Sequence, residues 1–85
     1  MKTFDYTIKD KLGIHARPAG LLVKKAGALT SSITISKGKK VVDAKRIFGI
    51  MGLSVKCGET ITMAVEGEDE DEDAEALEDF MKETW

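Results

Sequence analysis

The spacing of apolar residues alternates between two periods along this chain, and this alternation constrains the fold more than any other feature. Apolar residues two positions apart predict a strand with one buried face, whereas spacings of three and four positions predict a helix with one buried face. Strands are expected at residues 2–8, 33–35, 41–42 and 61–65. Helices are expected from about residue 16 to residue 27, at 46–53 and from about residue 70 to residue 85. Two glycines interrupt the middle helix, which should therefore have low local stability.

These elements follow the order β-α-β-β-α-β-α, which predicts an α+β fold. Each strand has one apolar face and each helix one apolar stripe. We therefore expect a four-stranded, mainly antiparallel sheet with three helices on one face and water on the other. The 85 residues are enough for one small domain, residues 1–85, and too few for two. A single cysteine, Cys57, cannot form an internal disulfide, so the apolar core must hold the domain together.

The small net charge of −2 hides an uneven distribution of charged residues. Residues 1–65 carry twelve Lys or Arg against four Asp or Glu, a net charge of +8. Residues 66–85 carry one Lys against eleven Asp or Glu, a net charge of −10. We expect the basic part to attract anionic partners by electrostatic steering. Nucleic acid is not an expected partner, because the basic residues are scattered and the acidic segment repels phosphates.

Metal, cofactor and membrane binding are not expected from this composition. One cysteine and one histidine cannot supply the four ligands of a zinc site, and the acidic run at residues 66–75 lacks the ligand spacing of a calcium loop. That run fits a solvated helix start, where negative charge favours the helix dipole. No apolar run approaches the ~20 residues of a membrane span. The amino-terminal segment also lacks the apolar core of a signal peptide, so we expect a cytoplasmic protein.

The segment GIHARPAG, residues 13–20, carries the chemistry of this chain. His15 is the only histidine and comes just before the first expected helix, in whose first turn Pro18 fits well. A helix start offers unpaired N–H groups and partial positive charge, and Arg17 adds planar donors suited to phosphate. A neutral imidazole beside such an anion site is a competent nucleophile toward a phosphoryl donor. The pattern predicts reversible phosphorylation of His15. It does not predict a self-contained enzyme, because no second catalytic group is positioned beside the ring.

The segments GIHARPAGLLVKKA, KGKKVVDAKRIFGIMGL and ALEDFMKE resemble the HPr family, the histidine-containing phosphocarriers of the bacterial sugar phosphotransferase system. The resemblance covers essentially the whole chain. It implies an open-faced β-sandwich of βαββαβα order, a monomeric carrier, and phosphorylation of His15 through Nδ1. It also implies that Arg17 is the active-site cation and that Ala16, Arg17 and Pro18 form the phosphate-binding turn. Enzyme I would be the phosphoryl donor, and IIA domains of sugar permeases would be the acceptors.

The same resemblance implies a docking surface formed by the first two helices. The residues at the corresponding positions are Gly20, Lys24, Ile47, Phe48 and Met51, with Lys45 and Arg46 at the rim. Ile50 and Leu53 are instead expected in the core. The short second helix has too many apolar residues to bury them all. An exposed apolar patch ringed by lysines suits brief encounters with partner proteins.

One position departs from the pattern of many family members. Where they carry a regulatory serine at the start of the second helix, this chain has Arg46, which cannot accept a phosphoryl group. We therefore expect the carrier role without the serine-kinase switch. The alternative is a regulatory module that binds a transcription regulator or a metabolic enzyme and transfers no phosphate. Retention of His15 and Arg17 favours the carrier.

Overall fold

The computed structural model describes all 85 residues and contains the seven elements in the expected order. They are β1 (Lys2–Thr7), α1 (Ala16–Gly27), β2 (Ser32–Lys37), β3 (Lys40–Asp43), α2 (Ile47–Gly52), β4 (Thr60–Glu66) and α3 (Glu70–Thr84). The bounds of α1 match the expected ones, and those of the other elements differ by two residues at most. In the hairpin, Lys37 pairs with Lys40, so the turn contains only Gly38 and Lys39. Gly38 has a φ of 60°, the left-handed conformation that tight hairpin turns require.

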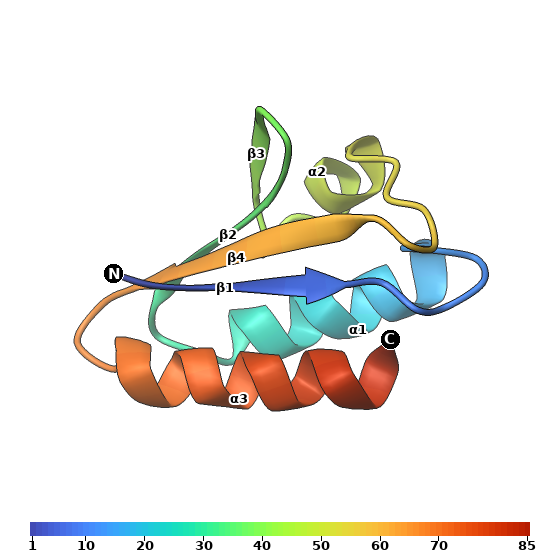
Figure 1. The fold of residues 1–85 in the computed structure, drawn as a ribbon. Helices are drawn as coiled ribbons and strands as arrows, with labels where there is room; N and C mark the ends of the chain where they lie inside the picture. Colours follow the sequence, from blue (N-terminus) through green and yellow to red (C-terminus); the bar gives the residue numbers. More distant parts are fainter.

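The sheet has the strand order β1-β4-β2-β3, and every neighbouring pair is antiparallel (Figure 1). One row of side chains crosses all four strands, because Phe4 pairs with Met63, Met63 with Ile35, and Ile35 with Val42. Met63 and Ile35 in this row are fully buried. The next row, which faces the other way, joins Asp5, Thr62, Ser36 and Val41. The register therefore separates an apolar face from a polar face.

All three helices cover the apolar face, as expected. Figure 1 shows α1 and α3 along the sheet, with the shorter α2 beside β3. The position of α2 follows from Gly49, where an added Cβ would lie 3.3 Å from the Cβ of Val42. Since Val42 belongs to the apolar row, α2 packs on the same face as the other two helices.

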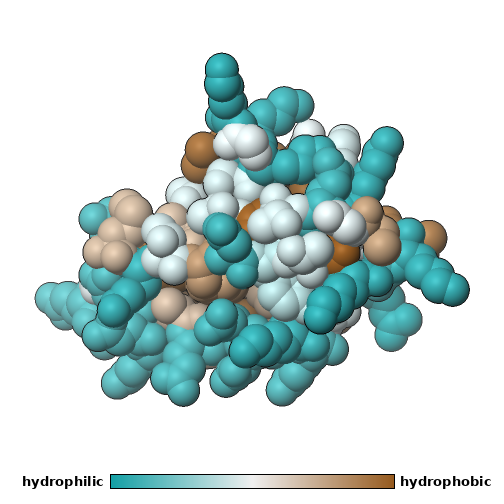
Figure 2. All heavy atoms as spheres, in the orientation of Figure 1, coloured by the Kyte–Doolittle hydropathy of each residue, from teal (hydrophilic) through white to brown (hydrophobic).

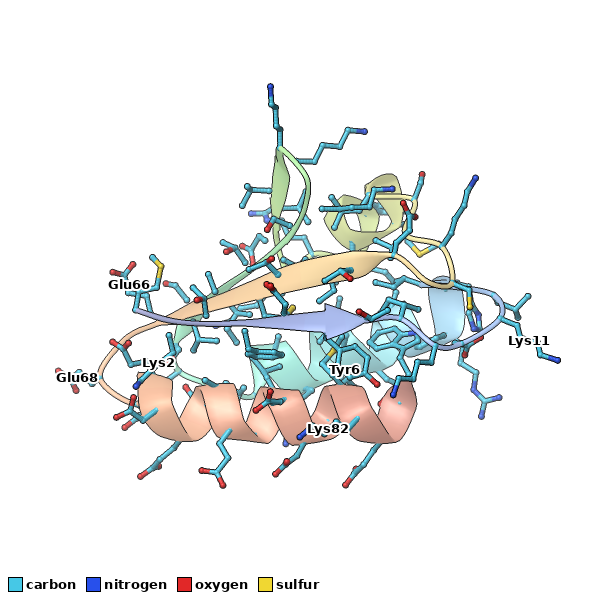
Figure 3. All side chains as sticks on the ribbon, in the orientation of Figure 1. Lys2, Tyr6, Lys11, Glu66, Glu68 and Lys82 are labelled. Carbon is cyan, nitrogen blue, oxygen red and sulfur yellow. The ribbon has the colours of Figure 1, made fainter.

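The core lies between the sheet and the helices. Its fully buried members include Ile50 and Leu53, which confirms their expected place. Two long-range contacts fix α3 against the rest of the domain. At its beginning, the buried Asp73 carboxylate accepts bonds from the Ser31 backbone N–H (3.1 Å) and hydroxyl (2.6 Å). At its end, the Tyr6 hydroxyl donates to the carbonyl of Trp85 at 2.8 Å, and Figure 3 shows Tyr6 between β1 and α3.

Charged side chains gather at the margins of the molecule. Figure 2 shows hydrophilic side chains over α3 and side chains of intermediate hydropathy over the strands. Glu66 ends β4 and Glu68 lies in the turn before α3, and both are at the opposite end of the sheet from Lys11 (Figure 3). No helix has both the length and the apolar character needed to cross a membrane.

Candidate functional site

His15 is the N-cap residue of α1, as predicted. Its backbone is extended (φ −116°, ψ 178°), and its carbonyl accepts the first helical bond, from the Ala19 N–H at 3.0 Å. The imidazole makes no capping bond, and 36% of the side chain is exposed. Pro18 lies buried in the first turn. The ring is therefore accessible to another protein while its backbone is fixed by the helix.

The loop before α1 holds His15 in place by clamping onto the segment that precedes β4. The Ile14 N–H donates to the Val55 carbonyl at 3.0 Å. Gly13 has a φ of 67° and packs so closely that an added Cβ would clash with the same carbonyl oxygen. Only glycine combines this conformation with this close approach. Gly13 therefore allows the loop to pack against Val55 and so fixes the backbone just before His15.

A surface pocket lies at the start of α1. It is lined by Asp10, His15, Arg17, Pro18, Leu21, Glu83 and Thr84. The predicted cation, Arg17, thus shares the pocket with His15. The Asp10 carboxylate oxygen Oδ2 lies 3.8 Å from Nε2 of the imidazole. The pocket therefore contains two carboxylates beside His15 and Arg17: that of Asp10, from the loop before α1, and that of Glu83, from the end of α3.

The first turn of α1 places positive potential beside this pocket. The N–H groups that open a helix have no partner within it and carry the positive end of its dipole. No acidic residue lies in this first turn to offset that field. Ala16 and Arg17 have N–H groups to offer, whereas Pro18 has none and contributes only a fixed backbone and a pocket wall. Together with the Arg17 guanidinium, these groups suit the oxygens of a phosphoryl group.

The predicted docking residues come from α1, from α2 and from the turn just before α2. Ile47 approaches Gly20, where an added Cβ would be 3.9 Å from its side-chain methyl. Phe48 is 89% exposed, and Met51 is partly exposed. Lys24 and Arg46 are also exposed. We call the seven predicted residues, Gly20, Lys24, Lys45, Arg46, Ile47, Phe48 and Met51, the α1–α2 patch. Lys45 differs from the others because its ammonium group donates to the Leu29 carbonyl at 3.2 Å.

Several pocket residues were not predicted from the sequence. Glu83 and Thr84 come from the end of α3, and only the packing of α3 along the sheet brings them to His15. Leu21 lies within the first expected helix, but nothing in the sequence marked it as a pocket residue. Asp10 could have been predicted from the sequence, because an acidic residue just before a glycine-containing turn can reach the start of the helix that follows. No group of three or more acidic, histidine or cysteine side chains is placed to hold a metal ion.

Comparisons with known proteins agree with this arrangement. A family profile described as "PTS HPr component phosphorylation site" matches residues 2–83. The phosphocarrier protein HPr of Lysinibacillus sphaericus is 48% identical over 83 residues, which cover 98% of this chain and 94% of the relative. The HPr-like protein Crh of Halalkalibacterium halodurans is 48% identical over 75 residues, covering 88% of this chain and 89% of the relative.

Solved structures give the same result. HPr from Thermoanaerobacter tengcongensis superimposes with a TM-score of 0.92 at 43% identity, covering 99% of this chain and 94% of that structure. The histidine-containing phosphocarrier protein of Mycoplasma superimposes with a TM-score of 0.93 at 37% identity, covering 98% of this chain and 94% of that structure. Sequence and fold agree over almost the full length, and the chain belongs to the HPr family of the phosphotransferase system.

Proposed function

We propose that this chain is a monomeric carrier that accepts a phosphoryl group from enzyme I on His15 and passes it to IIA domains of sugar permeases. The observation that supports this role most directly is the accessible imidazole of His15 at the start of α1, with Arg17 in the same pocket. A partner can reach the ring without moving the backbone. The chain needs no catalytic base of its own, since an imidazole nitrogen with a free lone pair is itself a nucleophile.

In the proposed reaction, the lone pair of His15 Nδ1 forms a bond to phosphorus as the bond between phosphorus and the donor breaks. The electron pair of the broken bond stays with the donor. The N–H groups of Ala16 and Arg17 and the Arg17 guanidinium then hold the phosphoryl oxygens. An acceptor reverses the step, and the N–P electron pair returns to the ring. Charge-assisted bonds of about 1.5–3 kcal/mol each would hold the group without preventing its release.

The α1–α2 patch is the proposed docking surface for both partners. Its exposed Phe48 provides apolar contact area, and the exposed Lys24 and Arg46 add positive charge to the same patch. Because Arg46 has no hydroxyl group, the proposed carrier is not switched by a serine kinase at this position.

Incubation with enzyme I and radiolabelled phosphoenolpyruvate tests the carrier role. The label is expected on His15, stable in alkali and lost in acid, as for a phosphoramidate. His15→Ala should take up no label, whereas Cys57→Ser, which removes the other exposed nucleophile, should label like the parent. An acid-stable label, or full labelling of His15→Ala, would contradict the proposal.

The identity to HPr-like protein Crh supports a second candidate, a regulatory module that binds a partner without transferring phosphate. The discriminating measurement is the affinity of parent and His15→Ala proteins for a transcription regulator of the same cell. Regulatory activity that persists without the imidazole, together with no label on the parent protein, would favour this candidate over the carrier.

A further inference from the structure

We propose that Asp10 is a positioning residue for His15, whose carboxylate keeps the ring proton on Nε2 and so leaves the Nδ1 lone pair free. This inference rests on the proposed function, in which His15 receives a phosphoryl group. It concerns a residue in the loop before α1 that belongs neither to the phosphate-binding turn nor to the α1–α2 patch.

The Asp10 side chain is fixed by its own loop. Oδ1 accepts a bond from the Leu12 N–H at 2.9 Å, and the Asp10 carbonyl accepts a bond from the Gly13 N–H at 2.9 Å. The first bond occupies Oδ1 and leaves Oδ2 available, and the second fixes the backbone of the loop. Oδ2 is the oxygen that lies 3.8 Å from Nε2 of His15.

The polarity of this contact decides which ring nitrogen carries the proton. A carboxylate is only an acceptor, so it favours a proton on the nitrogen that faces it. The 3.8 Å separation exceeds a direct hydrogen bond and leaves an attraction between charge and N–H dipole. The side chains of His15 and Asp10 are 36% and 30% exposed, so water weakens this attraction without removing it. The other ionised side chains that line the pocket are Arg17 and Glu83, and neither forms an ion pair with the ring.

The same contact favours the transfer step. When Nδ1 donates its lone pair to phosphorus, positive charge develops on the ring while the proton stays on Nε2. The Asp10 carboxylate, held on that side of the ring, stabilises this charge. When the acceptor takes the phosphoryl group, the pair returns to Nδ1 and the ring is neutral again. No proton has to enter or leave the ring during either transfer.

Asp10→Asn tests the proposal with little disturbance of the loop. Its amide oxygen can still accept the Leu12 N–H, but the charge is lost and an NH₂ donor can face Nε2. Long-range ¹H–¹⁵N NMR spectra, recorded well above the midpoint of the ring titration, report which ring nitrogen is protonated. We expect the ratio of the Nε2–H form to the Nδ1–H form to fall about two- to fivefold, as for loss of an exposed charge interaction. Glu75→Gln, which removes an equal charge from an exposed position on α3, should leave the ratio unchanged.

The kinetic test uses the same two variants. The rate of phosphoryl uptake from enzyme I should fall about two- to fivefold for Asp10→Asn and stay at the parental value for Glu75→Gln. An unchanged tautomer ratio in Asp10→Asn overturns the positioning role even if His15 is phosphorylated normally. Absence of any label on the parent protein would instead overturn the proposed function, while the tautomer measurement would still stand.

Discussion

Arg17 is the only lysine or arginine that lines the pocket beside His15, and it forms no salt bridge within the chain. We expect Arg17→Ala to slow phosphoryl uptake about ten- to a hundredfold, because one or two charge-assisted bonds to the phosphoryl oxygens are lost. Since the side chain is exposed, the free energy of unfolding should change by less than about 0.5 kcal/mol. Rapid-quench labelling and urea denaturation measure the two quantities. Arg17→Lys should restore part of the rate of phosphoryl uptake. Equal rates for Arg17→Ala and the parent protein would show that the guanidinium does not bind the phosphoryl group.

Ser54 is the only residue other than glycine with a positive φ, 52°. It follows the end of α2, where its N–H donates to the Met51 carbonyl at 3.2 Å, and this position in a helix C-terminus favours glycine. We expect Ser54→Gly to raise the free energy of unfolding by about 0.5–1 kcal/mol, because the strain of the side chain exceeds the added freedom of the unfolded chain. Ser54→Ala retains the Cβ and should give no gain. Urea denaturation of both variants checks this, and a gain in the alanine variant would contradict it.

The attachment of α3 depends on a buried polar contact at its first turn. Asp73→Ala leaves the Ser31 N–H and hydroxyl without their shared acceptor, at a cost of about 2–4 kcal/mol in the free energy of unfolding. Asp79→Ala, in an exposed position on the same helix, should change it by less than about 0.5 kcal/mol. Denaturation curves give both values. Similar losses in the two variants would mean that α3 is held by apolar packing alone.

The turn before β4 should respond to acid through Glu59. Its carboxylate accepts a bond from the Lys56 N–H at 2.7 Å and lies 3.4 Å from the Lys37 ammonium, and these contacts lower the pKa of Glu59 below its ordinary value. A lowered pKa in the folded state stabilises the fold above the unfolded pKa, and this contribution is lost as the pH falls through the folded pKa. The stability difference between parent and Glu59→Gln should therefore be present at neutral pH and vanish in acid. Urea denaturation over a pH series measures this difference, and Glu68→Gln, at an exposed residue with no bonding partner, is the matched control.

The order of the elements could be predicted because most of them carry a local period of apolar residues, while β3 was indicated by the turn before Val41 and α2 by a short apolar segment. The place of His15 could also be predicted, since Pro18 and the helical spacing that follows fix where α1 begins. The strand order β1-β4-β2-β3 could not, because it depends on pairings between distant segments. For the same reason Glu83, which α3 brings to the pocket, was missed. Lys45 was placed at the rim of the docking surface, but its ammonium group is bound to a backbone carbonyl that local sequence does not reveal.

The charge of the molecule is unevenly distributed, with most of the acidic residues in the segment 66–85. The acidic turn before α3 lies at the opposite end of the sheet from the loop that leads to His15 (Figure 3), so we expect a negatively charged partner to approach the end that carries His15. The α1–α2 patch contributes to this field through Lys24 and Arg46, both exposed. We expect this arrangement to raise the association rate with a partner more than the lifetime of the complex, because charges at the rim of an interface act mainly on association.

Charge-reversal variants distinguish the contribution of the α1–α2 patch to the association rate from that of the total charge of the molecule. The double variant Lys24→Glu/Arg46→Glu should lower the association rate with enzyme I about tenfold at low salt, and the difference from the parent should shrink as salt is added. Lys39→Glu/Lys40→Glu changes the net charge equally at the β2–β3 hairpin, away from α1 (Figure 1), and should have a much smaller effect. Stopped-flow measurements over a salt series give the rates. Equal losses in the two double variants would mean that only the total charge steers the encounter, and the α1–α2 patch would lose its proposed role in association.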